Sequence, residues 1–145
     1  MLEMQGNIWD YHDQGWIVIP TNKQIKKSDS TAVMGAGLAR QAAERFPLLP
    51  RLLGDYLQIG SDVSYYTEFR LFCFPTKDHW RDESSIDLIR FGCSTLVTQS
   101  RNTEKIFLPA LGCGLGGLFW EDVKPVMAEM LPGDKFVVVL REEQL

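Results

Sequence analysis

Two glycine-rich segments are the part of this sequence best suited to holding a ligand. Residues 33–39 read VMGAGLA, and residues 111–118 read LGCGLGGL. Glycine costs backbone entropy on folding, so the four glycines between Gly112 and Gly117 require a reason. Without side chains, the backbone can approach an anion and point its N–H groups at it, and a helix that starts after the segment adds a favourable field. We expect both segments to face one crevice and hold a diphosphate; the alternative is that they are tight turns.

Neither segment matches a standard nucleotide-binding motif. The first lacks the third glycine of the dinucleotide fingerprint, because position 40 is Arg. The second has Leu118 and Phe119 where a P-loop has Lys and Ser or Thr. Kinase and P-loop NTPase chemistry is therefore excluded.

Lys77 is the side chain best suited to take part in a reaction. It follows an apolar run, within the sequence FPTKDHWR at residues 74–81. A partly desolvated lysine can become a neutral amine nucleophile, and a protonated one can protonate or stabilise a leaving group. On the residues alone, a solvated lysine after a strand is the commoner outcome.

These residues must be positioned by strands and helices, which alternate along the sequence. The nearly continuous apolar runs are typical of strands buried on both faces. The alternation predicts a three-layer α/β/α domain, residues 1–145, with a mixed, mostly parallel central sheet of about six strands. The expected strands are Leu2–Gln5, Trp16–Pro20, Val63–Thr67, Arg70–Pro75, Lys105–Ala110 and Lys135–Leu140. The expected helices are Gly37–Phe46, Pro50–Ile59, Ser84–Gln99 and Trp120–Met130.

The charge and cysteine content exclude several classes of protein. Fifteen Lys and Arg against nineteen Asp and Glu give a net charge of −4. This charge argues against a protein that binds a nucleic-acid backbone mainly through its overall charge. A local basic cluster remains in residues 23–31, KQIKKSDST, which are either a solvated loop or a lid over substrate. Three cysteines with no C-x-x-C pair predict neither a disulfide framework nor a metal site. No signal peptide or membrane-length apolar run is visible, so we expect a cytoplasmic, monomeric protein without membrane attachment.

Four motifs in order resemble the macro domain family, the ADP-ribose-binding module. They are GNI at residues 6–8, IVIPTN at 17–22, MGAGLA at 34–39 and LPALGCGLGGLFW at 108–120. The segment around Lys77 resembles the DarG-like branch of DNA-directed ADP-ribosyl glycohydrolases and the related terminal ADP-ribose glycohydrolases. The resemblance runs from about Leu2 to Leu140, and it implies the three-layer fold and ADP-ribose as ligand, with no cofactor.

The resemblance implies a role for several polar residues. Lys77 takes the place of the catalytic lysine, and Asn22 that of the asparagine beside the distal ribose. Asn7 stands where many members carry an Asp that binds the adenine amine, and its amide oxygen can still accept. Gly116 replaces an acid of the terminal glycohydrolases, which favours the DNA-directed branch. The residues implied to bind ADP-ribose are Asn7, Ile8, Asn22, Met34, Gly35, Ala36, Gly37, Leu38, Pro109, Leu111, Gly112, Cys113, Gly114, Leu115, Gly116, Gly117 and Leu118.

The expected function is hydrolytic removal of ADP-ribose from a modified macromolecule, with DNA bases ahead of protein side chains. His79, Trp80 and Arg81 are candidate nucleic-acid contacts, because an aromatic can stack on a base and Arg can bind phosphate; packing is the alternative. The branch implies a DarT-like toxin as partner. Three other functions stay open: a reader that binds ADP-ribose without turnover, an ADP-ribose 1″-phosphate phosphatase, and a protein ADP-ribosyl hydrolase.

Overall fold

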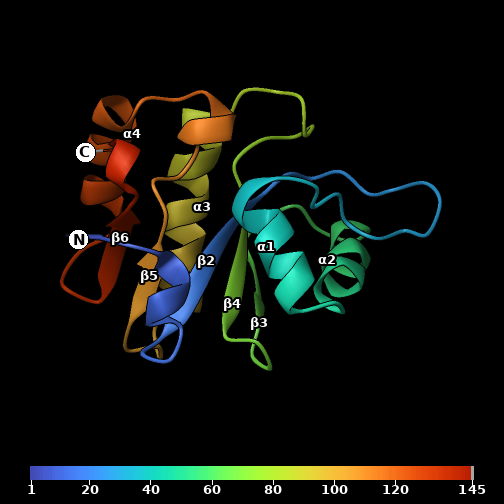
Figure 1. Ribbon diagram of the computed structural model, residues 1–145, viewed down its shortest axis with the longest axis horizontal. Coiled ribbons are helices and arrows are strands. Elements are labelled where there is room, and N and C mark those ends of the chain that lie inside the picture. The colour runs from blue at the N-terminus through green and yellow to red at the C-terminus, as the bar shows by residue number, and fades with distance from the viewer. Residues whose placement is uncertain (145) are drawn as a thin grey trace.

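Six strands form one sheet in the computed structural model, which describes residues 1–144 (Figure 1). The order across the sheet is β1-β6-β5-β2-β4-β3. All neighbouring pairs are parallel except β3 with β4, which is antiparallel. The strands are β1 (Leu2–Gln5), β2 (Trp16–Thr21), β3 (Ser64–Tyr66), β4 (Leu71–Pro75), β5 (Ile106–Leu108) and β6 (Phe136–Leu140).

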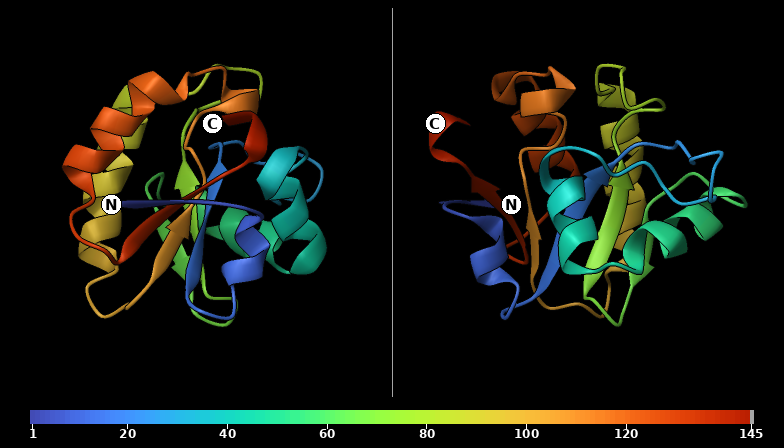
Figure 2. Two further views of the ribbon diagram at one scale, coloured as in Figure 1. Left: turned by 60° about the vertical axis from the view of Figure 1, so that its left-hand side comes forward. Right: turned by 45° about the vertical axis from the view of Figure 1, so that its right-hand side comes forward.

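Helices cover both faces of this sheet, which gives the three layers visible in Figure 2. Helices α3 and α4 pack on one face, and α1, α2 and the short η1 pack on the other. The α-helices are α1 (Gly37–Arg45), α2 (Leu49–Leu57), α3 (Ile86–Gln99) and α4 (Trp120–Met130). Three 3₁₀ helices complete the fold: η1 (Ile8–Tyr11), η2 (Gly114–Gly116) and η3 (Glu142–Gln144).

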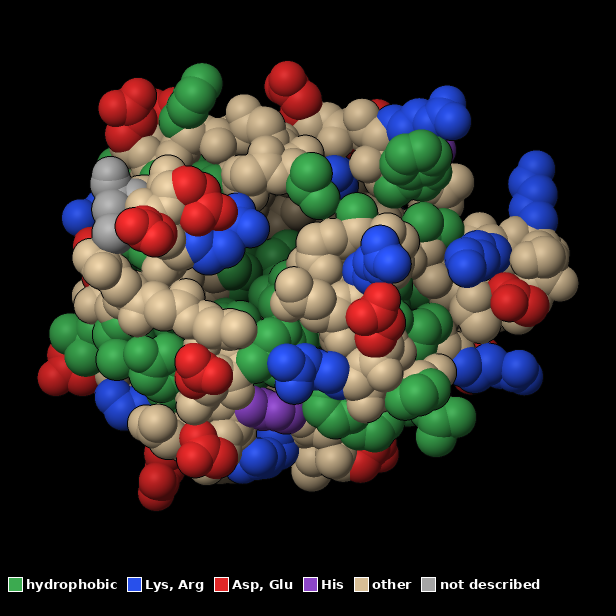
Figure 3. Space-filling model, viewed as in Figure 1, with side chains coloured by type: hydrophobic (Ala, Val, Ile, Leu, Met, Phe, Trp, Pro, Cys, Tyr) green, Lys and Arg blue, Asp and Glu red, His purple; other side chains and the backbone are tan. Residues whose placement is uncertain are grey.

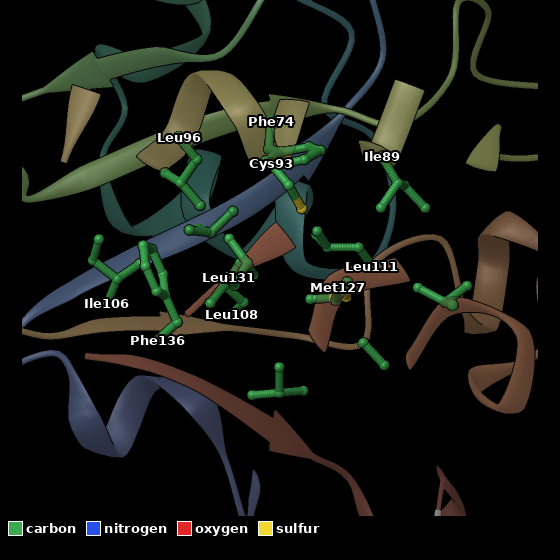
Figure 4. Packing of buried hydrophobic residues seen from close by; sticks show 14 of the residues in the cluster. Phe74, Ile89, Cys93, Leu96, Ile106, Leu108, Leu111, Met127, Leu131 and Phe136 are labelled. Atoms are coloured by element: carbon green, nitrogen blue, oxygen red, sulfur yellow. The ribbon is translucent and has the colours of Figure 1, made fainter. Parts of the chain in front are cut away.

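Alternating strand residues build two separate hydrophobic cores. Phe72 and Phe74 of β4 point to the α3/α4 side, whereas Leu71 and Cys73 point to the α1/α2 side. A period of two sends successive side chains to opposite faces, so strands buried on both faces must be apolar throughout. Figure 4 shows the α3/α4 core, where Phe74 packs near Ile89 and Cys93.

The predicted fold class is confirmed, and the helix and strand bounds differ by small amounts. Ser85 caps α3 by accepting a hydrogen bond from Leu88 N at 3.2 Å, and Asp87 lies in the first turn. Strand β5 is shorter than expected because Pro109, which has no N–H, ends its ladder. No helix within residues 1–144 combines the length and apolarity needed to cross a membrane.

Gly92 of α3 allows the helix to lie directly on the sheet. A Cβ at this position would collide with the ring of Phe74, which is fully buried. We expect Gly92→Ala to lower the free energy of unfolding, because overpacking costs about 1–3 kcal/mol and alanine gains only about 1 kcal/mol in helix propensity. Urea denaturation measures the change. Ser94→Ala, at an exposed site on the same helix, is the control, and equal or higher stability of Gly92→Ala would contradict this packing.

Candidate functional site

A cleft of about 1390 Å³ opens at the carboxyl ends of the five parallel strands. Each of these strands, or the segment directly after it, contributes to its lining, and the first glycine-rich segment adds a further wall. Ligand sites of open α/β sheets lie at this edge, where loops and helix N-termini converge. Figure 3 shows a hollow in the middle of the face viewed, with hydrophobic side chains inside it.

Asn22 fixes the segment that leads to the first glycine-rich segment. Its Nδ2 donates to Val33 O at 3.0 Å, and its Oδ1 accepts from Gln24 N at 2.9 Å. The side chain is buried, yet it lines the cleft beside the end of β2. An amide has two donor hydrogens and two acceptor lone pairs, so one of each remains available to a ligand.

The second glycine-rich segment adopts backbone conformations that favour glycine. Gly112, Gly114 and Gly117 have φ values of +74°, +81° and +80°. The segment is closed by a hydrogen bond from Leu118 N to Gly112 O at 3.0 Å. Left-handed conformations turn successive N–H groups and form concave backbone sites for anions. Leu115 is 72% exposed, and its Cδ1 lies 3.3 Å from the position of a Cβ on Gly37, so the two segments touch.

Gly116 is in close contact with Ser84, which lies two residues before the first residue of α3. Ser84 N donates to Gly116 O at 2.8 Å, and a Cβ on Gly116 would collide with Ser84 Oγ. The same hydroxyl donates to Thr76 Oγ1 at 3.2 Å. No side chain fits at position 116 while Ser84 keeps this place, so the site has no room for a carboxylate there.

Lys77 lies in the wall of the cleft, one residue after the buried Thr76. The backbone is held on both sides, because Thr76 N donates to Thr21 O at 3.0 Å and Ser85 N donates to Thr76 O at 2.8 Å. No side chain of residues 1–144 forms a hydrogen bond or ion pair with the Lys77 ammonium. The nearby Thr21 Oγ1 is buried without a partner among the described residues and also lines the cleft. The Lys77 ammonium is therefore available to a ligand at this end of the cleft, whereas the unpartnered Thr21 Oγ1 is buried.

The far end of the cleft is formed after β1 and β6. Asn7 caps η1 by accepting from Trp9 N at 3.1 Å, so its amide oxygen keeps one lone pair and its Nδ2 both hydrogens for a ligand. The residues Arg141 to Gln144, which include η3, line the cleft beside it. The sequence motifs assigned no role in the cleft to Thr21, Thr76 and Ser84. Thr21 is the last residue of β2 and Thr76 directly follows β4, so only their position at the ends of parallel strands could have indicated them.

Most of the predicted site residues meet in this cleft. Those that line it are Asn7, Ile8, Asn22, Met34, Gly35, Ala36, Gly37, Leu38, Lys77, Trp80, Pro109, Gly112, Cys113, Gly114, Leu115 and Gly116. Leu111 instead lies in the α3/α4 core, and Leu118 packs against that core. Gly117, His79 and Arg81 lie outside the lining.

The cysteine in the cleft is a protonated thiol at neutral pH. Burial raises the pKa of Cys113 from its ordinary value of 9.0 to about 11, and the negative charge of Asp122 adds to the shift. Burial also raises the pKa of Cys93 to about 12. The thiolate is the nucleophilic form, so Cys113 is unsuited to nucleophilic catalysis.

No family model matches the sequence, but known proteins resemble it in sequence and structure. The DNA ADP-ribosyl glycohydrolase of Thermus aquaticus is 33% identical over 124 residues, which are 77% of this chain and 34% of that protein. The solved macrodomain of Thermus aquaticus DarG superimposes with a TM-score of 0.77 over 97% of both chains, at 27% identity.

A second relative carries two named activities. The DNA ADP-ribosyl transferase–DNA ADP-ribosyl glycohydrolase fusion protein of Thermosipho africanus is 42% identical over 73 residues, 49% of this chain and 18% of that protein. A solved structure named as Thermosipho africanus DarTG in complex with ADP-ribose has a TM-score of 0.73, at 26% identity, over 89% of this chain and 38% of that one. The match thus spans about a third of the length of the first of these curated relatives and less than a fifth of the second.

The contact between Gly116 and Ser84 predicts a specific double-mutant result. Gly116→Ala should lower the free energy of unfolding by about 1–3 kcal/mol, because the new Cβ collides with Ser84. In a Ser84→Gly background the same change should cost less, since the colliding atoms are gone. Urea denaturation of the four proteins gives the interaction energy. Gly35→Ala, where a Cβ meets nothing within 4 Å, is the control, and an equal cost in both backgrounds would rule out the collision.

The raised pKa of Cys113 predicts slow alkylation. At pH 8 its thiolate fraction is about a hundredfold below that of a thiol with the ordinary pKa, because the two pKa values differ by about two units. Iodoacetamide labelling, followed by peptide mass spectrometry, should therefore be slow at pH 8 and should keep rising above pH 9. N-acetylcysteine is the reference thiol. Labelling of Cys113 at the reference rate would show that the thiol is not shielded as described.

Proposed function

The chain belongs to the macro domain family, and on that premise we propose that it binds ADP-ribose and releases it hydrolytically from ADP-ribosylated DNA bases. The similarity to solved DarG macrodomains confirms the family resemblance indicated by the four motifs. The observation that carries the proposal is the cleft itself, which is lined by both glycine-rich segments and by a lysine that has no hydrogen-bond or ion-pair partner within residues 1–144. The names of the two relatives support DNA as the modified macromolecule.

The ligand would run across the ends of the strands. Neighbouring strands lie about 4.8 Å apart, so the ends of β1 and β4 are separated by four spacings, roughly 19 Å. Asn7 after β1 would then take the adenine, the two glycine segments the diphosphate, and Asn22 after β2 the distal ribose. This order places the reacting sugar beside Lys77, because β2 and β4 are neighbours.

Lys77 is the titratable group best placed to act on that sugar. The others in the cleft lining are Cys113, which is a protonated thiol, and Arg141, Glu142 and Glu143, which follow β6. The end of β6 lies three spacings, roughly 14 Å, from the end of β4. As a neutral amine, Lys77 would add to C1″ of the ring-opened sugar while the base is still attached; the base would then leave with a proton, and water would hydrolyse the resulting imine and restore the amine. As an ammonium, Lys77 would instead stabilise the leaving base, and water would take its place at C1″. Binding energy from the distant ADP portion would orient the sugar for either step.

The relatives also support a biological setting. The Thermosipho africanus fusion protein joins a transferase and a glycohydrolase in its name, so we propose that a DarT-like transferase makes the substrate and is the functional partner. We place this activity in the cytoplasm, where the three free cysteines stay reduced.

Replacing Lys77 tests the proposed chemistry. Lys77→Ala should reduce release of ADP-ribose from a single-stranded oligonucleotide with one ADP-ribosylated thymidine by on the order of a hundredfold or more, because the catalytic group is lost. Lys77→Arg keeps the charge but cannot supply a neutral amine, so recovery in this variant indicates the ammonium role. Release is measured by chromatography of the products.

Calorimetry with free ADP-ribose separates binding from turnover. Wild-type protein and Lys77→Ala should both bind it. If the protein binds ADP-ribose but releases nothing from the oligonucleotide, from an ADP-ribosylated peptide or from ADP-ribose 1″-phosphate, it is a reader. If the folded protein does not bind ADP-ribose, the proposal is refuted. Full activity of Lys77→Ala would remove this residue from the mechanism.

A further inference from the structure

An ordered arm, residues 23–33, extends from the end of β2 beside the cleft (Figure 1). Its two sides are paired, because Val33 N donates to Gln24 O at 3.0 Å and Lys26 N donates to Thr31 O at 2.8 Å. Near the tip, Asp29 Oδ1 accepts hydrogen bonds from both the backbone N–H and the hydroxyl of Thr31. The arm is therefore a fixed hairpin that holds Lys26 and Lys27 in one place.

The arm is docked on α2 and tied to the segment that carries Lys77. Ala32 N donates to Pro50 O at 2.8 Å, and Gly54 of α2 lies so close that a Cβ there would collide with Ser30 O. Lys23 is bonded to Asp78 through its backbone N–H, at 3.0 Å to the carbonyl, and through an ion pair of 3.4 Å. The arm and the segment after β4 thus form one connected surface at the β2/β4 end of the cleft.

Trp80 presents an aromatic ring on this surface. It is 46% exposed and lines the rim of the cleft three residues after Lys77. The ring stacks with His79 at 5.6 Å and 27°, and the guanidinium of Arg81 lies 4.6 Å from its centre. The turn is held by hydrogen bonds from His79 N to Asp82 Oδ2 and from Arg81 N to His79 Nδ1. A large exposed aromatic is thereby fixed where the modified macromolecule would leave the cleft.

Apart from Lys23, the cations of this surface lack carboxylate partners. Within residues 1–144, Lys26, Lys27, Lys77 and Arg81 form no ion pair. The acid nearest the tip, Asp29, is engaged in its turn with Thr31, and Lys26 acts on it only at longer range. Figure 3 shows Lys and Arg side chains gathered to the right of the hollow, in a chain whose net charge is −4.

We propose that the arm and the Trp80–Arg81 turn bind the single-stranded DNA that flanks the ADP-ribosylated base. This inference rests on the proposed function and extends it from the modified nucleotide to its neighbours in the strand. Fixed aromatics with unpaired cations are the usual means of holding single strands, because bases stack on the ring and cations bind phosphates. A base within a duplex is stacked and paired, so an unpaired strand presents its modified base to this cleft without the cost of extruding it from the stack.

Two variants test the surface, each with a matched control. Lys26→Ala/Lys27→Ala removes two cations, and Arg90→Ala/Lys124→Ala removes two from the opposite helical layer. Trp80→Ala removes the aromatic, and Phe91→Ala removes one that is 61% exposed on α3. Fluorescence anisotropy measures binding of an unmodified, labelled oligothymidylate against salt concentration. Release assays compare the ADP-ribosylated oligonucleotide with ADP-ribosylated thymidine alone.

The variant Lys26→Ala/Lys27→Ala should bind the oligothymidylate roughly tenfold more weakly at low salt. It should also lower the slope of log affinity against log salt concentration by about 1.4, since each phosphate contact on a single strand contributes about 0.7 to this slope. Trp80→Ala should weaken binding by roughly tenfold at any salt concentration. Both should lower the ratio of kcat/KM on the oligonucleotide to kcat/KM on the nucleoside, and the controls should leave this ratio unchanged.

Unchanged ratios and affinities in both test variants would overturn the strand-binding surface while leaving the proposed hydrolase intact. The same holds if the variants impair release from an ADP-ribosylated peptide and not from the oligonucleotide, since the surface would then serve a protein substrate. If wild-type protein releases nothing, the proposed function fails, and the anisotropy series still decides whether the surface binds a strand.

Discussion

The parallel direction of five strands is the constraint on which the site depends. Their carboxyl ends share one edge, so residues from Asn7 to Arg141 meet in one cleft although most of the chain separates them. The two hydrophobic cores keep that edge in place, because each strand is packed on both faces. Changing the direction of any one of these strands would remove its loop from the cleft.

The second requirement is the close contact between the second glycine-rich segment and the residues before α3, which limits the side chains that can line the cleft. The contact of Gly116 with Ser84 leaves no space for an acid, and Ser84 in turn is bonded to Thr76, next to Lys77. The same contact thus excludes a carboxylate and positions the lysine. A change of catalytic strategy at this site would require several residues to change together.

The sequence predicted the fold well because the pattern of apolar residues reflects which side chains are buried. Strands such as β4 are apolar throughout, and the expected start of α3, Ser84, lies one residue before the observed cap, Ser85. The second glycine-rich segment was found because four glycines in six residues are unusual, whereas Lys77 was assigned its role through the resemblance of its segment to the DarG-like branch. The 3₁₀ helices and the position of Leu111 in the core were not predicted, since single turns have no periodicity and a motif does not show which of its residues face inward. The docking of the arm depends on Gly54, whose closeness to Ser30 O is a tertiary contact that no local pattern encodes.

Leu115 of the second glycine-rich segment is 72% exposed, and its Cδ1 lies 3.3 Å from where a Cβ on Gly37 of the first segment would stand. Exposed side chains change rotamer within picoseconds to nanoseconds. Rotation of this one leucine can therefore widen or narrow the gap between the two segments while their backbones stay in place. A bound ligand can select the rotamer that fits it without the cost of rearranging either backbone segment.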